Sequence, residues 1–160
     1  MKKINLVFNL FWVIVLVWFI NGFQSLNAQK KSDNDMVMSV NQSFYTAFKD
    51  GDINMMDKAW SHSSFVSAIH PISKDVIIGW KGVRESFEGV FKNYTHINIM
   101  SVNPTVHIEG NVAWVLCNEE FEAQQGDKNV KLTSAATNMF VKKSGKCLMV
   151  HHQATVPVPM

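Results

Sequence analysis

The stretch VAWVLCNEEFEAQQGDKNVKLTSAATNMFV, residues 112–141, contains two runs in which apolar and polar residues alternate. A period of two is typical of β-strands, because successive side chains of a strand point to opposite faces of the sheet. Gln125-Gly126-Asp127 joins the two runs, and its glycine tolerates a positive φ. The stretch therefore predicts an antiparallel hairpin.

The same period continues on both sides of this hairpin. Gly110-Asn111 precedes it and Lys143-Ser144-Gly145 follows it, and both segments are suited to tight turns. Pro104 lacks the N–H that a strand ladder needs, so it predicts a bulge or a bend. The result is a predicted antiparallel meander of four strands: Thr95–Glu109, Val112–Gln124, Asn129–Val141 and Cys147–Thr155.

Helical periodicity precedes the meander. Apolar residues spaced by three and four between Met36 and Phe48 predict an amphipathic helix, which Gly51 ends. Asp52 is suited to cap a second, short helix that ends near Trp60. Together the two helices form a predicted helical hairpin.

A short β-hairpin and a third helix lie between these helices and the meander. The hairpin is predicted from Phe65–His70, which Pro71 stops, and Val76–Trp80. The helix that follows carries Val83 and Phe87 on its apolar face. Helices against an antiparallel sheet define the α+β class, and a single domain is expected.

The amino terminus predicts export. Met1-Lys2-Lys3 precedes an apolar run that is densest over Phe11–Ile20, and small or polar residues lead to Ala28. We interpret residues 1–28 as a signal peptide cleaved near Ala28, with an uncleaved anchor as the alternative. The expected product is a soluble periplasmic or secreted chain without stable membrane insertion. Its parts are a polar leader (29–35), a domain (36–156) and an extended tail (157–160).

Charge and cysteine content exclude several classes of function. Processing removes two of the 15 basic residues and none of the 13 acidic ones, which leaves a net charge near zero. No basic stripe with interleaved aromatic residues is present, so nucleic acid is not an expected partner. Cys117 and Cys147 lie on strands that a third strand separates, so two buried free thiols are expected.

Four segments, in this order and spacing, resemble a known family. They are Phe44–Asp52, Ile69-His70-Pro71, Gly79–Phe87 and Val150–Ala154. They are similar to the SnoaL-like branch of the nuclear transport factor 2-like superfamily over roughly Met36–Val156. The resemblance implies three helices that close a curled antiparallel sheet into a cone with an apolar cavity. Members include ketosteroid isomerases, polyketide cyclases, dehydratases and non-catalytic binding modules.

The resemblance also implies candidate catalytic residues. His70 falls where ketosteroid isomerases carry their aspartate base, and alternation places it on the same face as Val66 and Ala68. Asn138 falls where those enzymes place an oxyanion-stabilising carboxylic acid. Phe44 stands near the position of their tyrosine donor and cannot donate a hydrogen bond, a departure that counts against steroid isomerisation. A structural or ligand-orienting His70 is the alternative.

His151 is the third candidate catalytic residue. The resemblance implies that Cys147 faces inward, so alternation through Met149 places His151 on the inward face and His152 on the outward face. An inward pair of His70 and His151 lacks an evident carboxylate, so no metal site is predicted.

Aromatic side chains supply candidate ligand contacts, with core packing as the alternative role. The candidates are Tyr45, Trp60, Trp80, Phe87 and Trp114. The acidic residues Glu119, Glu120 and Glu122 alternate across both faces of their strand, and we interpret them as a solvated strand end.

Three functions are compatible with this pattern. The first is a binding module that holds a small apolar or aromatic molecule in its cone. The second is a cofactor-free enzyme for proton transfer, an isomerase, dehydratase or cyclase, with His70 as general base and Asn138 and His151 as hydrogen-bond donors. The third is an interaction module that uses the sheet face. Because the strands carry apolar residues on both faces, a homodimer formed through the sheet is expected.

Overall fold

The computed structural model describes residues 33–157. The chain divides into two units, Met1–Asp35 and Met36–Met160, and the second unit contains the folded domain. The predicted signal peptide (1–28), most of the predicted leader (29–32) and the end of the tail (158–160) lie outside the described residues. No helix among residues 33–157 is long and apolar enough to cross a membrane.

Three helices are found in the described part of the chain: residues 33–50, α2 (Ile53–Ala59) and α3 (Trp80–Asn93). Gly51 follows the first helix with φ 63°, the left-handed conformation predicted for it. The Asp52 carboxylate then accepts hydrogen bonds from the backbone N–H groups of Asn54 and Met55, at 2.8 and 3.1 Å. This N-cap explains why α2 begins directly after the turn.

Six strands form one sheet in the order β2-β1-β6-β5-β4-β3. β1 pairs parallel with β6, and every other pair is antiparallel. The four long strands begin and end within three residues of the predicted bounds. The six are β1 (Ser67–Ile69), β2 (Ile77–Ile78), β3 (Thr95–Glu109), β4 (Val112–Gln125), β5 (Lys128–Lys143) and β6 (Lys146–Thr155).

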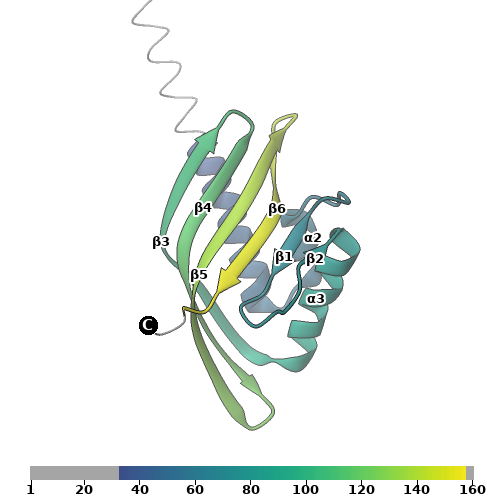
Figure 1. Ribbon diagram of the computed structural model, residues 1–160, viewed down its shortest axis with the longest axis vertical. Helices are drawn as coiled ribbons and strands as arrows, with labels where there is room; N and C mark the ends of the chain where they lie inside the picture. The colour runs from purple at the N-terminus through teal and green to yellow at the C-terminus, as the bar shows by residue number, and fades with distance from the viewer. Residues whose placement is uncertain (1–32, 158–160) are drawn as a thin grey trace, which may run out of the picture. The chain divides into compact units, whose positions relative to one another are not determined.

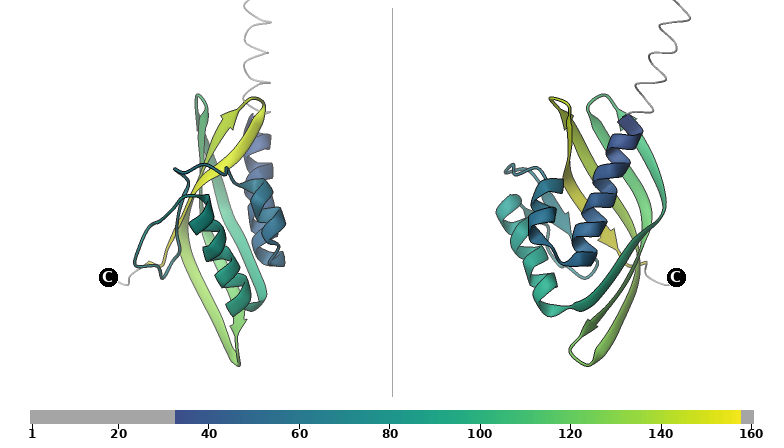
Figure 2. Two further views of the ribbon diagram at one scale, coloured as in Figure 1. Left: turned by 90° about the vertical axis from the view of Figure 1, so that its right-hand side faces the viewer. Right: turned by 180° about the vertical axis from the view of Figure 1, so that it is seen from behind.

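The helices cover one face of a curled sheet that does not close (Figures 1 and 2). Seen from behind in Figure 2, the first helix lies in front of the long strands, and α2 and α3 lie beside it. The core fills the space between the two layers, where Phe44 packs edge-on against Phe87 and Trp60 with ring centroids 5.8 and 6.3 Å apart. The α+β class and the helix-covered curled sheet are confirmed. Trp80, expected to end a strand, instead begins α3, because Gly79 turns the chain at φ 82°.

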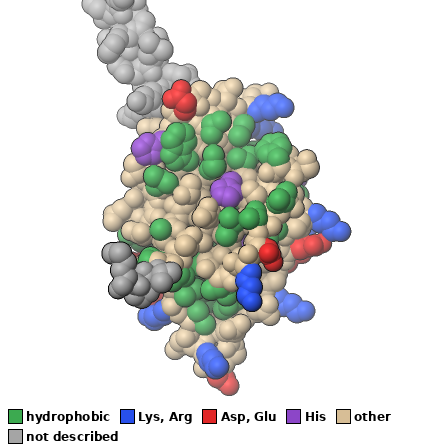
Figure 3. All heavy atoms as spheres, in the orientation of Figure 1, with side chains coloured by type: hydrophobic (Ala, Val, Ile, Leu, Met, Phe, Trp, Pro, Cys, Tyr) green, Lys and Arg blue, Asp and Glu red, His purple; other side chains and the backbone are tan. Residues whose placement is uncertain are grey.

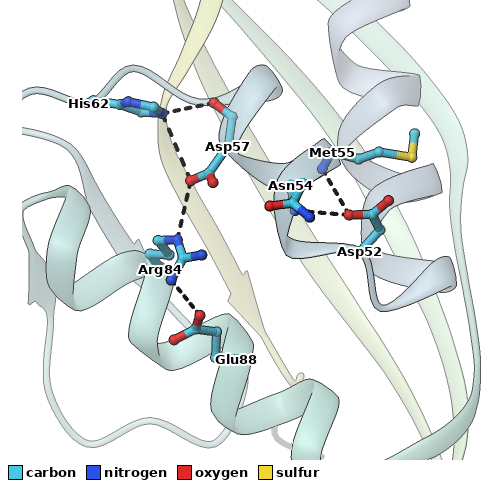
Figure 4. A network of polar contacts seen from close by, with 7 residues as sticks. All are labelled: Asp52, Asn54, Met55, Asp57, His62, Arg84 and Glu88. Carbon is cyan, nitrogen blue, oxygen red and sulfur yellow. Dashed lines mark hydrogen bonds and ion pairs between the residues drawn. The ribbon is translucent and has the colours of Figure 1, made fainter.

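Polar contacts join α2 to α3 at the edge of this helical layer (Figure 4). Arg84 lies between two carboxylates: its Nε is 3.3 Å from Asp57 Oδ1, and its Nη1 contacts Glu88 Oε1. His62 Nε2 lies 2.8 Å from the backbone oxygen of Asp57. These contacts fix the end of α2 against α3.

Three register shifts occur in the described sheet, and the shifts near Pro104 and Val150 bear on which side chains face inward. Between Val102 and Thr105, two residues of β3 oppose one residue of β4, and Asn103 has φ 52°. This is the bulge that Pro104 predicts. On β6 a second bulge lies between Met149 and His151, which pair with the adjacent residues Phe140 and Met139 of β5. Val150 is therefore an additional residue, and the alternation of β6 changes phase after it.

The outer face of the sheet carries apolar side chains between polar ones (Figure 3). Met100 and Leu116 are 47% and 42% exposed there. Trp114 shares this face and stacks on His107, with ring centroids 5.5 Å apart.

Candidate functional site

A pocket of about 210 Å³ lies between the helices and the inner face of the sheet. Its walls come from the end of the first helix, α3, β3, β4, β5, β6 and the loop after β1. The wall is mostly apolar, and the polar groups Glu119, Ser134, His70 and His152 lie among its lining residues. The full lining is Phe48, His70, Pro71, Ile72, Ser73, Val90, Tyr94, Ile99, Glu119, Phe121, Leu132, Ser134 and His152.

Glu119 is a buried carboxyl group in this pocket, 3% exposed. The Tyr45 hydroxyl donates to its Oε1 at 2.7 Å, and the Ser134 hydroxyl donates to its Oε2 at 3.3 Å. Ser134 lies directly opposite Glu119 on β5, whereas Tyr45 reaches it from the first helix. The carboxyl group on β4 is thus held by the neighbouring strand β5 and by the first helix, which is far from it in the sequence.

Asn138 connects this carboxyl group to a histidine. Its Nδ2 donates to Asn41 Oδ1 at 2.8 Å and to the Tyr45 hydroxyl at 3.1 Å. Its Oδ1 lies 2.7 Å from His152 Nδ1. Because an amide oxygen only accepts, His152 must carry its proton on Nδ1, and its Nε2 is left as an acceptor.

His70 lines the same pocket from the end of β1, on the side shared with the buried Val66 and Ala68, as the alternation predicts. Its Nε2 lies 3.0 Å from Ser86 Oγ, and that hydroxyl donates its proton to the Val83 carbonyl oxygen at 2.7 Å. Ser86 Oγ must therefore accept from a protonated Nε2, which leaves Nδ1 of neutral His70 as an acceptor.

Burial controls the ionisation of these groups. Burial raises the pKa of Glu119 from 4.5 to about 7, against the hydrogen bonds from Tyr45 and Ser134, which lower it. Burial, with the nearby His152, lowers the pKa of His70 to about 4. Burial, with the nearby His151, lowers the pKa of His152 to about 3. At neutral pH the pocket therefore contains two neutral imidazoles and a carboxyl group near its midpoint of ionisation.

Tyr45 and Cys117 remain protonated at neutral pH. Burial, followed by the charge of Glu119, raises the pKa of Tyr45. Burial also raises the pKa of the Cys117 thiol, whose Sγ lies 3.4 Å from the Tyr45 hydroxyl. Cys117 and Cys147 are both buried and are not joined in a disulfide, as predicted.

The expectation that His151 faces the cavity is wrong. The bulge at Val150 reverses the alternation of β6, so His152 is inward and opposite Asn138. His151 lies on the other face, where its Nδ1 is 2.8 Å from Ser67 Oγ. His70 and Asn138 therefore share one network with His152, and His151 is separated from it by the sheet.

None of the five aromatic residues predicted to contact a ligand is among the lining residues of the pocket. Trp60 and Phe87 are fully buried in the core, and Trp80 packs against Trp60 and His62. Trp114 lies on the outer face of the sheet, because it alternates with the inward Ala113 and Val115. Tyr45 alone among the five belongs to the polar network of the pocket.

Glu119 is the residue that the sequence interpretation missed, since a solvated strand end was expected there. Glu120 and Glu122 are exposed, but Glu119 is buried. A signal was present, because Glu119 has the same parity as Val115 and Cys117, which are inward residues of β4. Within residues 33–157 no group of three His, Cys, Asp or Glu side chains is arranged to hold a metal ion.

A curled sheet with three helices on one face and a pocket between them defines the nuclear transport factor 2-like class of fold. Solved structures agree with this assignment. A candidate dehydratase of that class from Streptomyces avermitilis matches with TM-score 0.74 and 22% identity, over 81% of this chain and 99% of that one. A superfamily member from Salmonella enterica serovar Typhimurium matches with TM-score 0.75 and 17% identity, over 82% and 95%.

The sequence itself identifies the family. The family model of the SnoaL-like domain matches residues 37–159, so the chain belongs to the SnoaL-like domain family. Among curated proteins, the F-box protein SKIP8 of Arabidopsis thaliana is 25% identical over 137 residues. That match covers 86% of this chain, and the chain spans about half, 54%, of the length of this relative.

Proposed function

We propose that the pocket binds a small, largely apolar molecule. The carrying observation is the separation of its lining into an apolar wall and the polar group of Glu119, Ser134, His70 and His152. A pocket with a few convergent polar groups in an apolar wall is the usual form of a small-molecule site. An apolar cavity of about 150 Å³ is enough for a benzene-sized molecule, so about 210 Å³ suits a single ring with a short substituent.

Native mass spectrometry of the protein purified from its own host tests this proposal. We expect a small molecule to accompany the protein. Leu132→Trp would fill the pocket from β5 and should release that molecule. Leu116→Trp is the matched control, because Leu116 is exposed on the outer face of the same sheet. Equal retention in both variants would show that the molecule is bound elsewhere, and a consistently empty wild-type protein would count against a resident ligand.

Cofactor-free proton transfer is a second candidate function, favoured by a specific observation. Glu119 and His70 line one pocket, and burial places the pKa of Glu119 at about 7. A carboxyl group with that pKa can both give and take a proton near neutral pH, which suits a general acid or base. His70 remains the base that the sequence predicts, and Glu119 joins it as a candidate.

Export and assembly complete the proposal. The amino-terminal pattern supports cleavage near Ala28 and a mature chain that begins near Gln29. Amino-terminal sequencing of the protein recovered outside the cytoplasm tests this, and a start at Met1 in washed membranes would contradict it. The apolar outer face of the sheet supports a homodimer formed through that face.

A further inference from the structure

The polar groups clustered at Glu119, His70 and His152 are acceptors rather than donors, and the hydroxyl groups of Ser73 and Tyr94 lie elsewhere in the lining. Hydrogen-bond geometry leaves Nδ1 of His70 and Nε2 of His152 without protons, because each ring uses its N–H on a protein acceptor. The hydroxyl protons of Tyr45 and Ser134 are both directed at Glu119. The donors of the network are thus already used within the protein.

The charge of the pocket has one sign. Among the described residues, no lysine or arginine lines it, and Glu119 is its acidic group. Asn138 supplies no donor to the pocket either, because its Nδ2 binds Asn41 and Tyr45. A carboxylate, sulfate or phosphate ligand would therefore bring a second negative charge beside Glu119, with no positively charged side chain in the lining to balance it. Such an anion would lose its hydration without a compensating charge.

We infer that the ligand of this pocket is a small apolar amine, whose ammonium group binds Glu119 and the acceptor nitrogens of His70 and His152 while its apolar body packs on the wall. This inference rests on the proposed small-molecule pocket. A primary ammonium group has three N–H donors, and the pocket offers a carboxylate and two imidazole nitrogens. The carboxylate also supplies the opposite charge that a buried ammonium requires. A neutral alcohol donates one hydrogen bond and lacks that charge attraction.

The effect of ligand charge can be measured with three ligands of nearly equal size and shape: 2-phenylethylamine, 2-phenylethanol and phenylacetate. Their affinities for the wild-type protein purified from its own host would be measured by isothermal titration at pH 8, where Glu119 is mostly ionised. We expect the amine to bind at least about tenfold more tightly than the alcohol, as charge-assisted hydrogen bonds do. Phenylacetate should bind most weakly.

Two variants identify the group responsible. Glu119→Gln should remove the preference for the amine over the alcohol and change the affinity for the alcohol less than about threefold. Glu120→Gln is the matched control, because Glu120 is the next residue on β4 and is exposed. It should leave all three affinities unchanged. The wild-type comparison needs no variant, so the inference stays testable even if Glu119→Gln fails to fold.

The outcomes separate the two proposals. Binding of phenylacetate as tight as that of the amine, or an amine preference that survives Glu119→Gln, would overturn the inference while the small-molecule pocket stands. Binding of the alcohol alone would do the same. If none of the three ligands binds, the inference fails and the proposed function fails with it for ligands of this size.

Discussion

Asn138 and His152 face each other on neighbouring strands, with 2.7 Å between Asn138 Oδ1 and His152 Nδ1. This contact fixes the proton of His152 on Nδ1 and continues, through Asn138 Nδ2 and the Tyr45 hydroxyl, to Glu119. Every N–H and O–H along this route has a defined acceptor. The network therefore has one direction, and it ends at the carboxyl group that lines the pocket.

The first prediction concerns the pH dependence of stability. Glu119 has a pKa of about 7 when folded, against 4.5 for an unperturbed group. The contribution of Glu119 to stability is therefore complete below about pH 4.5. It is lost as the pH rises to about 7, because over that range the carboxyl group ionises in the unfolded chain but stays protonated in the folded protein. At about 1.4 kcal/mol per pH unit, the loss is at most about 3 kcal/mol.

Glu119→Gln removes this titration. Relative to wild type, the variant should become more stable between pH 5 and pH 8, by up to about 3 kcal/mol. The buried histidines titrate in both proteins, so their contributions cancel in the comparison. Urea unfolding at the two pH values measures the difference. If the difference in free energy of unfolding between variant and wild type does not change with pH, the pKa of Glu119 is not raised by burial.

The second prediction concerns the tautomers of the buried histidines. At pH 7 we expect neutral His70 with its proton on Nε2 and neutral His152 with its proton on Nδ1, since burial lowers both pKa values to about 4 and 3. Nitrogen-15 NMR of the imidazole rings distinguishes the two tautomers. Ser86→Ala should shift His70 toward a mixture of tautomers and leave His152 unchanged. A proton on Nδ1 of His70 in wild type would refute the assignment.

The third prediction concerns assembly through the sheet. We expect the native protein to be a dimer by light scattering at micromolar concentration. Leu116→Glu places a charge on the outer face and should give monomers, because a buried unpaired charge at an interface is costly. Ile78→Glu is the control, since Ile78 is 68% exposed on the edge strand β2, which three strands of the sheet separate from β4. Monomeric wild-type protein would exclude this interface.

Local rules explain how much of the fold the sequence predicts. Period-two alternation locates β3–β6, and the glycine turns separate them, because both signals depend only on neighbouring residues. Gly51 and Asp52 mark the helical turn for the same reason. The helix-covered sheet then follows from the need of each apolar face for a partner.

The bulge that sets the inward histidine, and the residue that reaches Glu119 from the first helix, have no local signal in the sequence. The bulge at Val150 adds one residue to β6, and no glycine or proline in the sequence marks it. If alternation is continued through Val150, it places His151 inward. In the structure, His152 is the inward residue. Glu119 presents a related difficulty, since a carboxyl group on an inward strand position is stable only when distant partners meet it. Of its two partners, Ser134 lies opposite on the paired strand β5, and Tyr45 is brought there from the first helix by the tertiary structure.

The fourth prediction separates binding from catalysis at His70. His70→Gln retains approximate size and hydrogen-bonding capacity but removes the titrating group. We expect it to change ligand affinity by about 0.5–1.5 kcal/mol, the usual net contribution of one hydrogen bond. If His70 were a general base, turnover of a substrate would fall about 10²-fold or more while the fold is kept.

The pH profile assigns any reaction to one of the two groups. Activity that needs neutral His70 would rise through pH 4, the pKa of the buried ring, and be constant near neutrality. Activity that needs ionised Glu119 would instead rise through about pH 7. We therefore expect the activity of His70→Gln still to rise through about pH 7. In Glu119→Gln, this pH-dependent rise should disappear. A reaction that rises near pH 4 and is lost in His70→Gln would make His70 the base and overturn the binding interpretation of this residue.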